Sequence, residues 1–184
     1  MMNRAGIGLA VSSFSGGTLL LLIFYFSSKM DIAFVGYLFL IVAGTVNLCM
    51  LIVLMIKAIK DSNNRRNYLK TSGLMVLNIP VVIIYLFAFI FLTNTMRICF
   101  INETGKPITD IRIMGCATKF INKLDINESK TCWIDIPGDC SITIEYKLDG
   151  KMKREEVFNY VTNSMGQRVT YRIGTQSKPI DETF

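Results

Sequence analysis

The sequence predicts a membrane α + β chain, with a three-helix transmembrane bundle followed by a small antiparallel β-sandwich. Three long apolar stretches without a charged residue fill the first half. Short runs of alternating apolar and polar residues fill the second half. The mean hydropathy of +0.41 suits a chain divided in this way. We expect a transmembrane domain over 1–96, a β-sandwich over 97–174 and a flexible tail over 175–184.

Each apolar stretch has the length of a membrane span. A helix needs roughly twenty apolar residues to cross a hydrocarbon core of ~30 Å. The predicted spans cover about 6–28, 32–57 and 70–96. Arg4 precedes the first span as in a signal peptide. The apolar run is long and no small-residue cleavage site follows it, so we interpret it as a retained helix.

The basic residues predict an orientation. They gather between the second and third spans, against the single acidic Asp61: Lys57, Lys60, Arg65, Arg66 and Lys70. An excess of Lys and Arg is typical of cytoplasmic loops. We therefore expect a cytoplasmic N-terminus, a cytoplasmic loop over 57–70 and a periplasmic or extracellular β domain. Arg97, just after the third span, is a single contrary charge.

Small and polar residues inside the spans are candidates for helix docking: Ser12, Gly16, Gly17, Asn47 and Asn78. Ser12 and Gly16 have the small-xxx-small spacing that lets helices approach closely. Thr45 and Pro80 also lie inside spans, and Pro80 permits a kink. These residues indicate either a docking face for another membrane subunit or packing among the three helices. We favour internal packing, because no charged residue lies at depth to mark an ion or proton path.

The second half reads as a series of short strands. The alternation is clearest over 142–148, where Ile142, Ile144, Tyr146 and Leu148 share one face. Asp149-Gly150 follows, a dipeptide that favours a two-residue hairpin. Turns every eight to twelve residues predict a compact sandwich of six or seven strands. Trp133 faces away from Cys132 and Ile134, and such a residue marks a partner contact, a membrane interface or an ordinary outer face.

The cysteines of the β domain allow one disulfide. A core of this size gains from a covalent link, and an extracytoplasmic setting permits it. Cys116 with Cys140 is the pairing we favour, and Cys132 is the alternative partner. Three free thiols are the other possibility, since spacing alone does not decide connectivity.

The composition argues against several classes of function. The chain has no histidine, the commonest general base and metal ligand. No phosphate loop or metal-ligand spacing occurs, so we expect no enzymatic activity, no cofactor and no metal. The net charge of +6 reflects the basic membrane flank, so we expect no nucleic-acid partner.

One segment resembles a known family. Asn102 to Ile108, with the pattern N-x-T-G-x-P-I, is similar to the opening of transthyretin-like and carboxypeptidase-regulatory-like β domains. The whole arrangement resembles small three-span membrane proteins of the Bacteroidota with a C-terminal transthyretin-like or Ig-like β domain. The resemblance implies a bacterial inner-membrane setting and carries no activity.

The sequence is compatible with three functions. The first is a non-enzymatic accessory protein that presents its β domain to a membrane-protein partner or to a second copy of the chain. The second is an oligomeric transport or channel-type subunit, with Thr45, Asn47 and Asn78 along a polar path. The third is a thiol-dependent envelope enzyme that uses Cys99 or Cys116.

Overall fold

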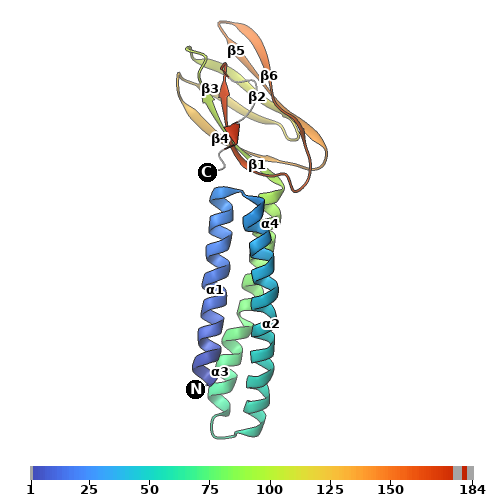
Figure 1. Ribbon diagram of the computed structural model, residues 1–184. Coiled ribbons are helices and arrows are strands. Elements are labelled where there is room, and N and C mark those ends of the chain that lie inside the picture. Colours follow the sequence, from blue (N-terminus) through green and yellow to red (C-terminus); the bar gives the residue numbers. More distant parts are fainter. Residues whose placement is uncertain (1, 176–179, 182–184) are drawn as a thin grey trace. The chain divides into compact units, whose positions relative to one another are not determined.

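The computed structural model describes residues 2–175 and 180–181. These form two compact units, Met1–Phe89 and Ile90–Phe184. The first unit is helical and the second is mainly β-structure (Figure 1).

Four helical segments make three long apolar helices: α1 (Met2–Ser27), α2 (Met30–Lys60), α3 (Arg65–Val76) and α4 (Asn78–Thr93). Three helices in the described residues are long and apolar enough to cross a membrane: Asn3–Ser27, Met30–Lys60 and Arg65–Thr93. This agrees with the prediction of three long apolar helices. The helices start earlier than the predicted spans because polar residues such as Arg4 and Arg65 continue the helix beyond the apolar stretch.

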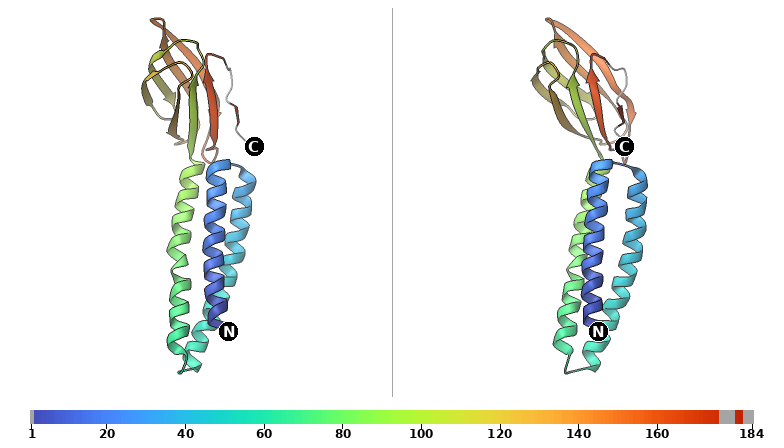
Figure 2. Two further views of the ribbon diagram at one scale, coloured as in Figure 1. Left: turned by 90° about the vertical axis from the view of Figure 1, so that its left-hand side faces the viewer. Right: turned by 60° about the vertical axis from the view of Figure 1, so that its left-hand side comes forward.

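The third helix is interrupted at Leu77, where α3 passes into α4 (Figure 2). Pro80 has no N–H to donate to the carbonyl of Val76, four residues earlier, so the regular hydrogen bonding stops there. The break lies beside α1, because Nδ2 of Asn78 donates a 3.0 Å hydrogen bond to the carbonyl of Ala10. The helical core centres nearby on Ala10, Leu54 and Met75.

The β unit contains two four-stranded sheets, ordered β4-β1-β7-β8 and β3-β2-β5-β6. The strands are β1 (Thr95–Asn102), β2 (Ile108–Gly115), β3 (Lys119–Leu124), β4 (Ser129–Asp135), β5 (Cys140–Leu148), β6 (Lys151–Val161), β7 (Arg168–Ile173) and β8 (Ile180–Asp181). Apolar side chains from both sheets form one core that includes Phe100, Ile134, Ile144 and Tyr171. The predicted Asp149-Gly150 hairpin is confirmed, and both residues have the positive φ that such a turn needs.

Three details of the prediction are wrong. The sandwich is not wholly antiparallel, because β1 and β7 pair in parallel. Both strands start at the end of the sandwich where α4 enters, β1 directly and β7 after the β6–β7 loop. The third span does not reach residue 96, because Thr95 and Met96 pair with β4. Met96 is apolar because it packs in the β core, where it is fully buried.

The third error concerns the tail expected over 175–184. Ile180–Asp181 form the short strand β8, which pairs antiparallel with β7. The rest of that expectation, over 176–179 and 182–184, lies outside the described residues.

The turn that carries the family resemblance takes the chain from one sheet to the other. Asn102 is fully buried at the end of β1. Its Nδ2 donates to the carbonyls of Lys106 at 2.8 Å and Leu124 at 3.0 Å. Its Oδ1 accepts hydrogen bonds from N–H and Oγ1 of Thr104. The Asn and Thr of the pattern therefore hold the turn between β1 and β2.

Candidate docking groove in the helical unit

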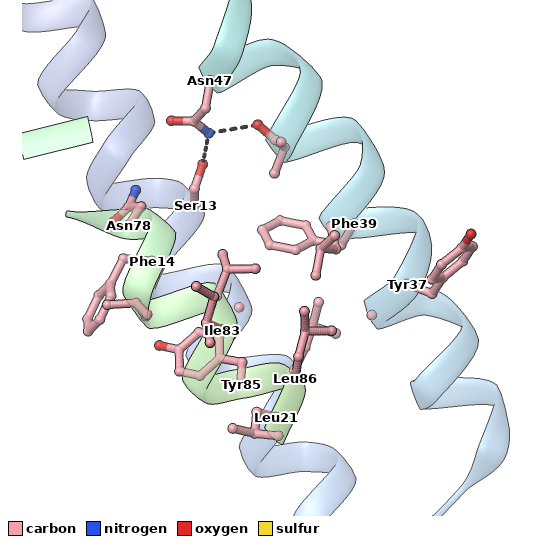
Figure 3. A pocket seen from close by; sticks show the side chains of 18 of the residues that line it. Ser13, Phe14, Leu21, Tyr37, Phe39, Asn47, Asn78, Ile83, Tyr85 and Leu86 are labelled. Atoms are coloured by element: carbon pink, nitrogen blue, oxygen red, sulfur yellow. Dashed lines mark hydrogen bonds between the residues drawn. The ribbon is translucent and has the colours of Figure 1, made fainter. Parts of the chain in front are cut away.

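An apolar groove with a cavity volume of about 510 Å³ lies between α1, α2 and α4 (Figure 3). Its lining residues come from all three helices, and Met75 of α3 adds to one end. The two walls opposite α1 are α2 and α4. Such a site can take an apolar chain or helix, and its polar atoms decide which partner suits it.

The predicted docking glycines of α1 are covered by the other helices. A Cβ on Gly16 would lie 2.7 Å from the ring of Phe39, and one on Gly17 would lie 3.1 Å from Tyr85. Oγ1 of Thr18 and the phenol of Tyr85 form a 2.5 Å hydrogen bond beside them. The glycines therefore serve packing within the bundle, whereas Ser12 is exposed and lies outside the groove lining.

The wall formed by α2 is open. Six of its eleven groove-lining residues recur at three- and four-residue intervals: Ala33, Gly36, Leu40, Ala43, Asn47 and Leu51. A Cβ on Gly36 or Gly44 would meet nothing within 4 Å. On α4, Ile79, Val82, Leu86 and Phe89 follow the same intervals along the opposite wall. We call each of these two rows of groove-lining residues, one on α2 and one on α4, a seam. Two seams with this spacing suit the packing of one more helix between them.

Asn47 is the polar group of this groove. Its Nδ2 donates to Oγ of Ser13 at 2.6 Å and to the carbonyl of Ala43 at 2.7 Å (Figure 3). Its Oδ1 is buried, and no donor from the part of the chain that the structure describes reaches it. A buried acceptor without a donor costs about 1–3 kcal/mol. A hydroxyl or amide from another molecule would remove this cost.

Asn78 and Thr45, the other polar candidates of the spans, have partners within the bundle, whereas Oδ1 of Asn3 and Oγ of Ser72 are also buried without a partner among the described residues. Asn78 bonds to Ala10, and Oγ1 of Thr45 donates to the carbonyl of Ile41 at 2.8 Å. Of the predicted docking residues, the structure therefore brings Asn47 and Asn78 to the groove lining, together with Gly17. Gly36 and Tyr85 were missed, although the seam spacing on α2 can be read from the sequence.

The cysteine candidates of the β unit differ in state. Cys116 and Cys140 form a disulfide, with a Cα–Cα distance of 5.1 Å. Cys99 and Cys132 are free, and burial raises the pKa of the Cys132 thiol, which disfavours the reactive thiolate. Among the described residues, no group of three or more Cys, Asp or Glu side chains could hold a metal ion.

Trp133 lies on the outer face of β4 and is 36% exposed. Its ring stacks on Phe91, with centroids 5.8 Å apart, and the guanidinium carbon of Arg97 lies 5.7 Å from the ring centre. The chain itself therefore covers much of the proposed contact residue.

The structure defines a class of protein: three helices long and apolar enough to cross a membrane, joined to a β unit of two small sheets. No family model matches the chain, and no curated protein matches it. The NMR structure of a protein from Eubacterium rectale aligns with a TM-score of 0.33 and 17% sequence identity. That alignment covers 47% of this chain and 84% of the other.

Proposed function

We propose that this chain is a non-enzymatic integral membrane accessory protein that binds one transmembrane helix of a partner protein in the groove between α1, α2 and α4. The β domain lies on the extracytoplasmic side, as the sequence predicts. The observation that carries the proposal is the buried, unpartnered Oδ1 of Asn47 beside an open apolar seam.

A helix suits this seam better than a lipid chain. Lipid tails offer no hydrogen-bond donor to Asn47, whereas Ser, Thr, Asn or Gln on a partner helix does. Gly36 and Gly44 let a partner backbone approach α2 closely, which is how membrane helices gain contact without a hydrophobic driving force. The expected partner is therefore an apolar helix with small residues and one polar side chain at the depth of Asn47.

The orientation rests on charge and on the disulfide. Lys57 and Lys60 lie in the last turn of α2, and Arg65 and Arg66 begin α3. Arg97, the contrary charge, is only 3% exposed and lies over Trp133, so it does not act as a free loop charge. A Cys116–Cys140 disulfide is typical of an oxidising compartment.

The two alternatives receive less support from the geometry. A polar transport path would need Asn78 and Thr45 to give up the hydrogen bonds they make to helix carbonyls. A thiol-dependent enzyme would have to rely on Cys99, because the sulfur of Cys116 is bonded to Cys140.

Photo-crosslinking in native membranes tests the groove. A photoreactive residue at Leu40, which lines the groove, is compared with one at Leu38, which lies on the same helix outside the lining. We expect a discrete protein adduct from Leu40 and none from Leu38. The substitution Gly36→Leu should remove the adduct by filling the seam, whereas Gly8→Leu, equally free of neighbours, should not.

Three outcomes would overturn the proposal. Adducts with lipid alone would assign the groove to an acyl chain, and an adduct of two copies of this chain would assign it to a homodimer. Equal adducts from Leu40 and Leu38 would show that the groove has no selectivity. For the orientation, a thiol placed by Lys151→Cys should react with an impermeant maleimide in intact cells, above the level of the parent chain.

A further inference from the structure

The last turn of α4 is built into the β unit. Ile90 to Thr93 belong to the same compact unit as the sandwich. The N–H of Gly166, in the β6–β7 loop, donates a 2.7 Å hydrogen bond to the carbonyl of Thr93. The carbonyl of Asn94 accepts a 2.9 Å hydrogen bond from Ile136, in the β4–β5 loop. The β4–β5 and β6–β7 loops at this end of the sandwich therefore hold the end of α4.

The same junction closes around the side chain of Asn94. Its Oδ1 accepts a 3.1 Å hydrogen bond from the N–H of Ser164. A Cβ on Gly166 would lie 2.5 Å from the carbonyl oxygen of Thr93, so the loop and the helix end touch through backbone atoms. No free linker separates Thr93 from β1, which starts at Thr95.

Aromatic and apolar side chains remain exposed at this end. Phe91, on the last turn of α4, is 52% exposed and stacks on Trp133. Met165, in the loop that bonds to the helix end, is 41% exposed. The guanidinium of Arg97 lies over the ring of Trp133 in a cation–π contact. The stack therefore joins the last turn of α4 to the outer face of β4 within the β unit.

The opposite end of the sandwich has a different character. Exposed ion pairs lie there, between Lys106 and Asp149 at 2.7 Å and between Lys123 and Asp125 at 2.7 Å. Strands β1 and β7 run from the α4 end toward this charged end. The sandwich thus has an aromatic end at the helix and a charged end away from it.

We propose that Phe91, Trp133 and Met165 form an interfacial anchor that lies in the headgroup and upper acyl region of the phospholipid bilayer crossed by α4. This inference rests on the proposed membrane insertion. Tryptophan favours this region because it has a large apolar ring with one polar N–H. Phe91 supplies the continuity, since it belongs to the apolar helix and to the stack at once. The anchor holds the β unit against the membrane surface rather than free of it.

Trp133 is the only tryptophan of the chain, so its emission reports this patch alone. The full-length protein is reconstituted in phosphatidylcholine–phosphatidylglycerol vesicles, and insertion is checked by flotation. A lipid with a nitroxide on an acyl carbon near the headgroup should cause the largest loss of Trp133 emission. Nitroxide near the chain end should cause a smaller loss, and iodide in water a small loss.

A moved reporter provides the control. Ile126 is 50% exposed in the β3–β4 turn, at the charged end of the sandwich. In the double variant Trp133→Phe and Ile126→Trp, iodide should quench the emission and nitroxide lipids should not.

The result that overturns the inference is strong iodide quenching of Trp133 in inserted protein, without quenching by shallow nitroxide lipid. Protection of Trp133 from both quenchers would also overturn it, because that pattern indicates a protein partner on the patch. Failure of the protein to float with the vesicles would instead overturn the proposed membrane insertion. The two proposals therefore fail in distinguishable ways.

Discussion

Tyr171 on β7 donates a 2.8 Å hydrogen bond from its phenol to Oε2 of Glu155 on β6, and this bond joins the two sheets of the sandwich. The other carboxylate oxygen, Oε1, accepts a hydrogen bond from the phenol of Tyr146 on β5. Both tyrosines are at most 1% exposed. Glu155 thus accepts hydrogen bonds from both phenols, so the three residues act as one structural unit.

Loss of the Tyr171 hydroxyl should therefore destabilise the β unit. We expect Tyr171→Phe to lower the free energy of unfolding by about 1.5–3 kcal/mol, as for a hydrogen bond to a charged group. Urea unfolding of the full-length protein in detergent, followed by Trp133 fluorescence, measures it. Tyr160→Phe is the matched control, because its phenol also donates to a carboxylate, Asp139, but at an exposed site. An equal loss in both variants would contradict a special role for the buried bond.

The same cluster sets an alkaline limit on stability. Burial, followed by the hydrogen bond and charge of Glu155, raises the pKa of Tyr146 and of Tyr171 above the ordinary value. Because the folded pKa is the higher one, this contribution is fully present below the unfolded pKa of about 10. It is lost as the pH rises above that value toward the folded pKa. As the pH rises past about 10, the urea midpoint of the parent protein should decrease. The urea midpoint of the Tyr171→Phe variant should decrease less steeply. Parallel curves for the two proteins would refute this assignment.

Reduction of the disulfide should cost stability. The Cys116–Cys140 bond closes a sequence separation of 24 residues. The chain-entropy model assigns a loop of this size about 3 kcal/mol. Dithiothreitol should therefore lower the urea midpoint of the parent protein and leave the double variant Cys116→Ser and Cys140→Ser unchanged. A parent protein insensitive to dithiothreitol would show that the bond does not form or does not stabilise.

Replacement of the side-chain amide of Asn102 should destabilise the β unit. Asn102→Asp keeps the shape of the side chain but removes the Nδ2 donor shared by the carbonyls of Lys106 and Leu124. It also places a charge at a fully buried site, so we expect a loss of about 3 kcal/mol or more. Asn127→Asp is the control, because Asn127 is exposed and Asp tolerates its positive φ. Comparable unfolding midpoints for the two variants would contradict the role of Asn102.

Part of the candidate site could be read from the sequence. Asn47 and Asn78 stand out as amides inside apolar helices, and both line the groove. Gly16 and Gly17 were equally visible, yet they pack against Phe39 and Tyr85 within the bundle. Some glycines of the spans are covered by a neighbouring helix, and others, such as Gly36, have free space beside them. Only the positions of α2 and α4 in the bundle distinguish the two kinds. Glu155 pairs with Ile144 across β5 and β6 and accepts the phenol of Tyr146, a contact that the alternation of the strand does not reveal.

Local patterns were enough for the three long apolar helices and for the Asp149-Gly150 hairpin. Unbroken apolar stretches have one favourable state, a helix with its backbone satisfied internally, and alternation with Asp149-Gly150 specifies a hairpin without reference to the rest of the chain. The tertiary structure alone decided the parallel pairing of β1 with β7, the place of Met96 in the β core and the open acceptor of Asn47. Each of these depends on residues distant in sequence that meet in space. Strand pairing, side-chain burial and the satisfaction of hydrogen bonds depend on contacts between distant segments, so no single segment determines them.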